Sequence, residues 1–287
     1  MQIVTDRGAD LAPEQLQGLG ITHAQLMIQL DGKTYSSGVD LEPNEFYRML
    51  GETESFPTTS QPSAWEFAEL YRELAKKDAD IFSVHISSGL SGTINSARAG
   101  AAMVPEANVT FFDTMTLSVP EGWMVQAAAR MIEPGWPMDK VIAKLEVLRQ
   151  EINGIFTLNT LKYLIHGGRI SHIKGLMASL LNIKPIIGVE KEHGMYATFG
   201  QEITFKRAIG KMAETLEHWY PLGTRLRVQL LHGNNLDAVE LLREKMTHLY
   251  DCVMEPVTAI APVLGAHTGP GLVGMAAAPM AAFEDIP

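Results

Sequence analysis

The stretch IFSVHISSGLSGT, at residues 81–93, decides the fold of this chain. Residues 81–86 are a mainly apolar run typical of a buried strand, and a helix-like pattern follows at about residues 94–103. A turn rich in serine and glycine lies between the two. The pattern therefore predicts a strand, a tight turn and a helix start, whose free backbone N–H groups and partial positive charge favour an anion.

Strand-like and helix-like stretches alternate along the rest of the chain. The other expected strands lie at residues 3–5, 23–30, 33–37, 109–113, 155–158, 185–190, 195–199, 226–231 and 253–259. The other expected helices lie at residues 13–19, 43–50, 63–77, 117–132, 138–150, 172–182, 204–219 and 236–249, with a short one ending at 166. Asp10 is a candidate N-cap of the first helix, and Asp31-Gly32 is a candidate hairpin turn. The alternation predicts two α/β domains, residues 1–153 and 154–287, the first with a mainly parallel sheet.

Composition narrows the class of protein. The formal net charge of −10 over 287 residues argues against a protein that binds nucleic acid. A single cysteine, Cys252, leaves no intrachain disulfide to form. The first residues contain neither a basic nor an apolar signal segment, and the apolar stretch at residues 271–283 is too short to span a bilayer. We therefore expect a soluble cytoplasmic protein.

One segment of this acidic chain is locally cationic. No acidic residue occurs between Glu151 and Glu190. The basic residues and histidines in this segment are Lys162, His166, Arg169, His172, Lys174 and Lys184. Such a segment suits an anionic partner, or it forms a solvated face that carboxylates from elsewhere in the fold neutralise.

Three further motifs are rich in hydroxyl groups and glycine, namely TSQPS at residues 59–63, GGRIS at 167–171 and HTGPG at 267–271. A Thr or Ser before Pro62 commonly caps a helix, so Ser60 or Ser63 is the candidate cap and Thr59 the candidate ligand contact. Glycines around Ser91 and His267 indicate that the backbone approaches a ligand closely there.

These four motifs, in this order and at these spacings, resemble the DegV family of bacterial fatty-acid-binding proteins. The match covers essentially the whole chain and includes Thr5-Asp6 and residues 184–187. The resemblance implies a DegV-like α/β protein that holds one long-chain fatty acid between its two domains. It implies a carrier without cofactor or metal, not an enzyme. A separate ATP-dependent fatty acid kinase would convert the bound acid to an acyl phosphate for phospholipid synthesis.

The resemblance also assigns individual residues. It places the fatty acid carboxylate at Thr59, Ser91 and His267, with Ser60, Gly92, Thr93 and Thr268 beside them. It implicates Arg169 in engaging the kinase, and Lys174 and Arg207 would contact an acidic kinase surface, or anionic lipid head groups during transient exchange with a membrane. Two positions depart from the family pattern: Arg7-Gly8 follow Asp6 in place of the usual serine, and residues 114–118 match poorly.

A second interpretation is a serine hydrolase of acyl esters. Ser91 would be the nucleophile and His267 the base, with Asp113, Asp237 or Asp251 as the orienting acid. The sequence Gly-Leu-Ser-Gly argues against it, because a nucleophile elbow needs Gly-x-Ser-x-Gly. The chain also contains no P-loop and no Gly-x-Gly-x-x-Gly after a strand. Phosphorylation of a bound acid would therefore need another protein.

Overall fold

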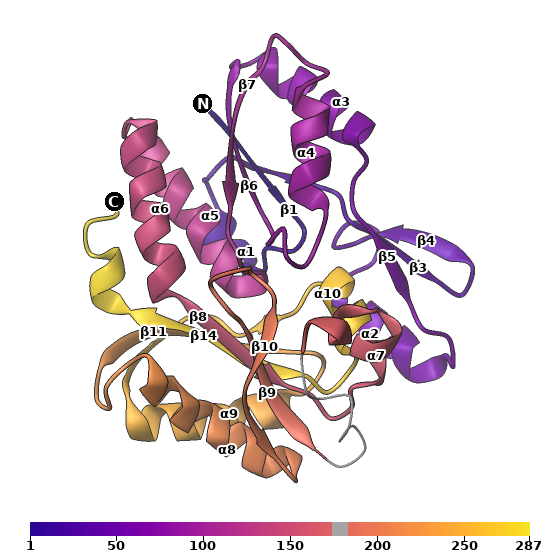
Figure 1. Cartoon of the computed structure of the whole chain (residues 1–287), viewed down its shortest axis with the longest axis vertical. Helices are drawn as coiled ribbons and strands as arrows, with labels where there is room; N and C mark the ends of the chain where they lie inside the picture. The colour runs from indigo at the N-terminus through magenta and orange to yellow at the C-terminus, as the bar shows by residue number, and fades with distance from the viewer. Residues whose placement is uncertain (174–182) are drawn as a thin grey trace.

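The first sheet of the computed structural model, which describes residues 1–173 and 183–287, is entirely parallel. Its strands, in spatial order, are β2 (Ile21–Ala24), β1 (Gln2–Asp6), β6 (Asp80–His85) and β7 (Asn108–Asp113). Helices α3 (Ala64–Ala75) and α4 (Thr93–Ala101) pack against β6 and β7 (Figure 1). The strand, turn and helix predicted for residues 81–103 are therefore confirmed, as is the parallel sheet.

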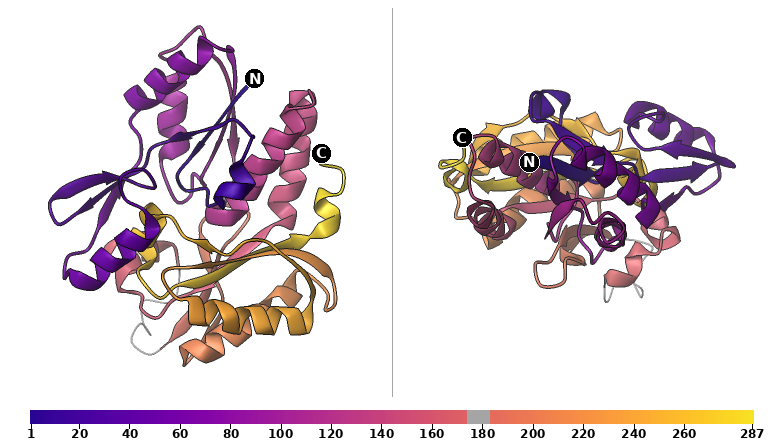
Figure 2. Two further views of the ribbon diagram at one scale, coloured as in Figure 1. Left: turned by 180° about the vertical axis from the view of Figure 1, so that it is seen from behind. Right: turned by 90° about the horizontal axis from the view of Figure 1, so that it is seen from above.

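A small antiparallel sheet projects to one side of the molecule (Figure 2). It contains β3 (Met27–Leu30), β4 (Lys33–Ser36) and β5 (Thr58–Ser60). Helix α2 (Pro43–Glu52) lies between β4 and β5 in the sequence. The turn residues Asp31 and Gly32 both have positive φ, as a two-residue hairpin turn requires. The single strand expected at residues 23–30 was wrong, because residues 21–24 pair with β1 and the chain then crosses into this second sheet.

The largest sheet contains the later strands of the chain. Its main path runs β10 (Tyr196–Glu202), β9 (Lys184–Val189), β8 (Asn153–Thr157), β14 (Val273–Pro279), β11 (Arg225–His232) and β12 (Asp251–Met254), and β13 (Thr258–Ala259) also pairs with β11. The strand expected at residues 253–259 is thus two short strands. No strand was expected at residues 273–279, because this segment is buried on both faces and shows no alternation.

Helices cover both faces of the largest sheet. Helices α8 (Phe205–Thr215) and α9 (Leu236–Leu249) pack on one face, and α5 (Ser118–Ile132) packs on the other against β8 and β14 (Figure 1). Helix α6 (Met138–Glu151) lies against α5 and the C-terminal turn η4 (Met280–Phe283). The main apolar cluster includes Trp123 of α5 and combines residues from the first and the largest sheets. The domain boundary at residue 153 stays a prediction.

The remaining elements are short. They are α1 (Pro13–Leu16), α7 (Lys162–His166), η1 (Arg169–His172), η3 (Leu216–His218) and α10 (Pro262–Thr268). Ser63 is the N-cap of α3, as predicted, and forms a capping box with Glu66. Asp10 does not cap α1, whose N-cap is Ala12. The helix expected at residues 172–182 lies outside the described residues from position 174 onward, and so does the partner residue Lys174. Within the described ranges no helix is long and apolar enough to cross a membrane.

Candidate functional site

A cavity of about 300 Å³ brings together residues from three of the four motifs and Arg169 from the fourth. We call it the head-group cavity. Its polar lining residues are Thr59, Ser60, Gln61, Ser91, Arg169, Tyr196 and His267, and its apolar ones are Leu26, Ile86, Leu90, Leu117, Val263 and Leu264. The loop after β6 supplies Ser91, because the chain turns there at the carboxyl edge of a parallel sheet, where ligands of open α/β sheets bind.

His267 and Thr59 form the centre of this cavity. The Thr59 hydroxyl lies 2.8 Å from His267 Nε2, and His267 Nδ1 is buried without a partner. Burial and the nearby Arg169 guanidinium lower the pKa of His267 to about 4. The ring is therefore neutral at pH 7, with Nε2 toward Thr59 and Nδ1 toward Gly167.

The glycine at position 167 makes room for the His267 ring. A Cβ on Gly167 would collide with His267 Nδ1 and would also crowd the Tyr163 carbonyl. Any side chain at this position would therefore displace the ring from Thr59. The motif at residues 167–171 thus serves the cavity twice, since its glycine leaves space and its arginine lines the wall.

Ser91 is held by the start of α4. Its Oγ lies 2.8 Å from the Thr93 hydroxyl and accepts a hydrogen bond from the Thr93 N–H at 3.3 Å. Thr93 itself is fully buried and does not line the head-group cavity. Gly92 does not line it either, since this glycine packs against the Gln61 side chain. Thr93 therefore positions Ser91, and Gly92 leaves room for the Gln61 side chain.

Gly89 of the second motif is packed against a distant part of the chain. A Cβ on Gly89 would collide with the carbonyl oxygen of His193, in the turn between β9 and β10. The Ser87 hydroxyl donates to the Gly194 carbonyl at 2.7 Å in the same contact. Gly89 therefore lets a hairpin of the largest sheet pack directly on the turn after β6.

Among the described residues that line the head-group cavity, Arg169 carries the one charged side chain. Its Nη1 donates to the Gly167 carbonyl at 2.8 Å, which orients the guanidinium. No ion pair within the described structure engages Arg169 at 4.0 Å or less. The sequence assigned this arginine to a partner protein, and the structure places it beside His267 and Tyr196.

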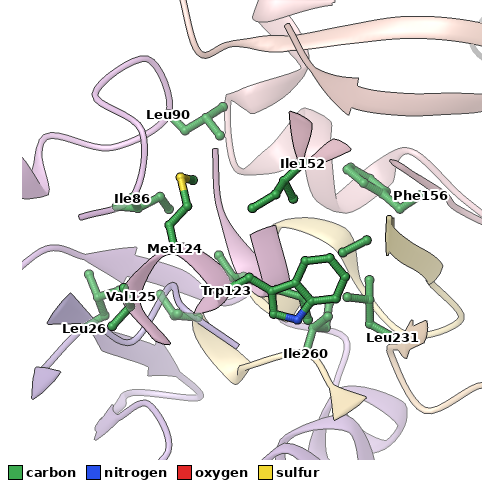
Figure 3. Packing of buried hydrophobic residues seen from close by; sticks show 14 of the residues in the cluster. Leu26, Ile86, Leu90, Trp123, Met124, Val125, Ile152, Phe156, Leu231 and Ile260 are labelled. Atoms are coloured by element: carbon green, nitrogen blue, oxygen red, sulfur yellow. The ribbon is translucent and has the colours of Figure 1, made fainter. Parts of the chain in front are cut away.

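A second, apolar compartment of about 40 Å³ adjoins the first. The two share Leu117, Tyr196 and Leu264 as lining residues. The apolar compartment extends between α5 and the largest sheet, where Phe156, Leu231 and Ile260 gather (Figure 3). Thr268 lines this compartment, and its hydroxyl is already used by the Leu264 carbonyl. The volume is little more than one water occupies, so a larger apolar ligand must move the walls.

The segment between β7 and α5 forms the wall between the two compartments. Leu117 lines both of them, and Met115 and Ser118 hold positive φ angles of 53° and 59°. Such backbone strain in non-glycine residues is concentrated at functional sites. Residues 114–118 and Arg7-Gly8 are the two departures from the family pattern. The first contributes lining residues to both compartments, whereas Arg7 lines neither of them.

The structure does not support a hydrolase. Ser91 pairs with Thr93, and His267 pairs with Thr59. Asp113 accepts hydrogen bonds from the Ser88 and Met115 backbone, and Asp251 lies 3.8 Å from Arg225. No carboxylate among the described residues reaches His267 Nδ1. The described residues also contain no group of three or more metal-ligating side chains placed to hold a metal ion.

These features define a class, a mixed α/β protein whose site has one polar and one apolar compartment. The model of the family described as "Uncharacterised protein, DegV family" matches residues 1–280. The chain belongs to the DegV family.

Curated relatives and solved structures resemble the chain over nearly its full length. A DegV domain-containing protein of Deinococcus radiodurans is 33% identical, covering 96% of this chain and 95% of the relative. One from Listeria monocytogenes is 31% identical over 95% and 96%. The structure of a fatty-acid-binding DegV family protein from Thermus thermophilus has a TM-score of 0.86 at 32% identity, over 97% of this chain and 99% of that one. DegV of Bacillus subtilis, a fatty acid binding protein, has a TM-score of 0.84 at 28% identity, over 97% and 98%.

Proposed function

We propose that this protein binds one long-chain fatty acid, with its carboxylate in the head-group cavity and its tail in the apolar compartment. The observation that carries the proposal is that the polar and the apolar compartment adjoin and share Leu117, Tyr196 and Leu264 as lining residues. Thr59, Ser91 and the neutral His267 supply hydrogen bonds, and Arg169 supplies the positive charge that a buried carboxylate needs. The fatty-acid-binding relatives from Thermus thermophilus and Bacillus subtilis support this ligand class.

We further propose that the protein is a carrier and not an enzyme. In this proposal, a separate ATP-dependent fatty acid kinase in the cytoplasm phosphorylates the bound acid, and the acyl phosphate enters phospholipid synthesis. The acid-free segment at residues 152–189 supports a contact with an acidic kinase surface or with a membrane during exchange. Arg207, which the sequence also assigned to the partner, lies on α8 and is paired with Glu202 at 2.8 Å.

The purified protein is expected to carry a fatty acid in a one-to-one ratio. An acyl chain fills space that would otherwise be empty or collapsed, and each buried methylene contributes about 0.8 kcal/mol. Denaturation, organic extraction and mass spectrometry measure the lipid, and a fluorophosphonate probe checks in parallel that Ser91 is inert. Absence of lipid, together with no uptake of added palmitate or oleate, would remove the proposal. Covalent labelling of Ser91 would favour the hydrolase.

The pKa of His267 is expected to rise when the fatty acid binds. The lipid-free value of about 4 reflects burial and the Arg169 charge, both of which disfavour the imidazolium. A carboxylate beside the ring adds a negative charge, which favours the imidazolium and raises the pKa. NMR titration of the imidazole signals before and after loading, assigned with a His267→Gln variant, measures the change. An identical titration in both states would place the carboxylate elsewhere.

Reversing charges on the acid-free segment is expected to lower acyl phosphate formation without changing fatty acid affinity. Lys162 is exposed on α7, beside the Phe56 and Tyr163 rings, and lines neither compartment, so Lys162→Glu reverses a surface charge without changing the cavity lining. Lys245→Glu, at an exposed position of α9, makes the same charge change at a distance and is the control. Turnover by the cognate kinase should fall only for Lys162→Glu, and the difference should shrink with added salt. Equal turnover for both variants would show that the acid-free segment does not contribute to the reaction with the kinase.

A further inference from the structure

A second polar cavity, of about 410 Å³, is separate from the proposed fatty acid site. It lies where the loop after β1, the loop after β4 and residues 257–262 meet, and it shares no lining residue with the head-group cavity. Its polar lining residues are Arg7, Asp10, His23, Ser37, Glu42 and Thr258. Helix α10 lies between the two cavities, since Ala261 and Pro262 line this one and His267 lines the other.

The Arg7 guanidinium lines this cavity, and no hydrogen bond or ion pair within the described structure engages it. Its Nε is buried without an acceptor, whereas the side chain as a whole is half-buried. Burial lowers the pKa of Arg7, and the nearby Glu42 charge opposes this effect from beyond 4.0 Å. A charged side chain that is partly withdrawn from water favours an opposite charge beside it. The guanidinium at the cavity wall is therefore open to an acceptor from outside the chain.

Two aspartates, at the end of β1 and in the loop after it, are already engaged by other residues. Asp10 accepts from the Ser118 hydroxyl at 2.6 Å and from the Ala261 N–H at 2.9 Å. Asp6 accepts from the backbone of Gly8 and Ile86 and contacts His85 at 2.9 Å. Burial and the Arg7 charge lower the pKa of His23 to about 4, so the ring is neutral at pH 7. No hydrogen bond within the described structure engages this ring. Arg7 and His23 thus offer donors to a cavity with little to accept them.

We propose that this cavity binds a small molecule through its carboxylate or phosphate group. The planar fork of Arg7 would hold two oxygens of the anion, and the His23 ring would donate to a third. The two carboxylates of the lining are Glu42, which is exposed, and Asp10, whose oxygens already accept from Ser118 and Ala261. The volume admits an anion larger than inorganic phosphate, so the ligand is a small metabolite and not a lipid tail.

Titration calorimetry of the lipid-loaded protein tests this site, with inorganic phosphate and succinate as probes and sodium chloride at matched ionic strength. The wild-type protein is expected to bind at least one probe saturably, and the stronger probe distinguishes phosphate from carboxylate. Arg7→Gln should bind about ten- to hundred-fold more weakly. Arg48→Gln, which removes an exposed arginine of α2 paired with Glu52, is the matched control and should bind as wild type.

Thermal melting without a probe separates a ligand-binding arginine from a structural one. Because Arg7 is unpaired, Arg7→Gln should melt at the wild-type temperature or above it, and fatty acid content should not change. A His23→Phe variant provides an independent measurement and should also weaken the probe. Absence of saturable binding to the wild type, or wild-type affinity in Arg7→Gln, would overturn the proposal, and so would a large loss of stability in Arg7→Gln.

Discussion

Fatty acid affinity is expected to rise about fourfold with each methylene between decanoic and hexadecanoic acid, since burying one contributes about 0.8 kcal/mol. Over this series the increase amounts to roughly three orders of magnitude. The rise should end where the apolar compartment ends. Displacement of a fluorescent fatty acid from lipid-stripped protein measures the series. A flat series would show that the tail lies on the surface and not between α5 and the largest sheet.

A pair of matched leucine variants tests where the tail lies. Leu231 of β11 lines the apolar compartment, whereas its neighbour Leu230 is buried on the opposite face of the sheet. Alanine at either position should destabilise the protein by about 2–5 kcal/mol. Only Leu231→Ala enlarges the compartment, so only this variant should change the dependence of affinity on chain length. The same change in Leu230→Ala would indicate a general loosening of the core.

Arg169→Gln is expected to weaken fatty acid binding about ten- to hundred-fold, because a hydrogen bond to a charged group contributes more than one between neutral groups. Arg169→Lys should retain part of the affinity, since it keeps the charge and loses the planar fork. Arg225→Gln removes an exposed arginine near Asp251 and is the control. Equilibrium binding of labelled palmitate measures all three variants.

Unchanged palmitate affinity in Arg169→Gln would favour the role that the sequence resemblance gave this arginine, which is contact with the kinase. That assignment predicts intact fatty acid binding even after charge reversal at Arg169. The structure leads to the opposite expectation, since Arg169 lines the head-group cavity and lowers the pKa of His267. The two roles are compatible only if the kinase reaches the carboxylate past Arg169.

Much of the fold could be predicted from local patterns. The strand and helix around residues 81–93 combine an apolar run, a turn and a helix within a short window, and each part agrees with the others. The capping box at Ser63 and the hairpin at Asp31-Gly32 are equally local. Strand β14 could not be predicted this way, because a strand buried on both faces loses the alternation that marks it.

The site was predictable only in part. Thr59, Ser91 and His267 belong to motifs, and the structure gathers all three around one cavity. Leu117 and Tyr196 were missed, since an apolar residue in a loop and a tyrosine at a strand start carry no signal of their own. The packing of Gly89 could not be predicted, because its contact, the hairpin turn at His193, lies about a hundred residues away in the chain. Long-range packing of this kind leaves no local pattern.

The position of β14 has a consequence for how the protein is made. This strand follows every other strand in the sequence, yet it lies between β8 and β11 and pairs with both. A nascent chain that has emerged only as far as residue 270 therefore exposes two unsatisfied strand edges in its largest sheet. Such edges attract other chains, and the non-local pairing that closes them forms slowly. Assembly of the largest sheet must wait until β14 has been synthesised, and chaperones would be needed most before that point.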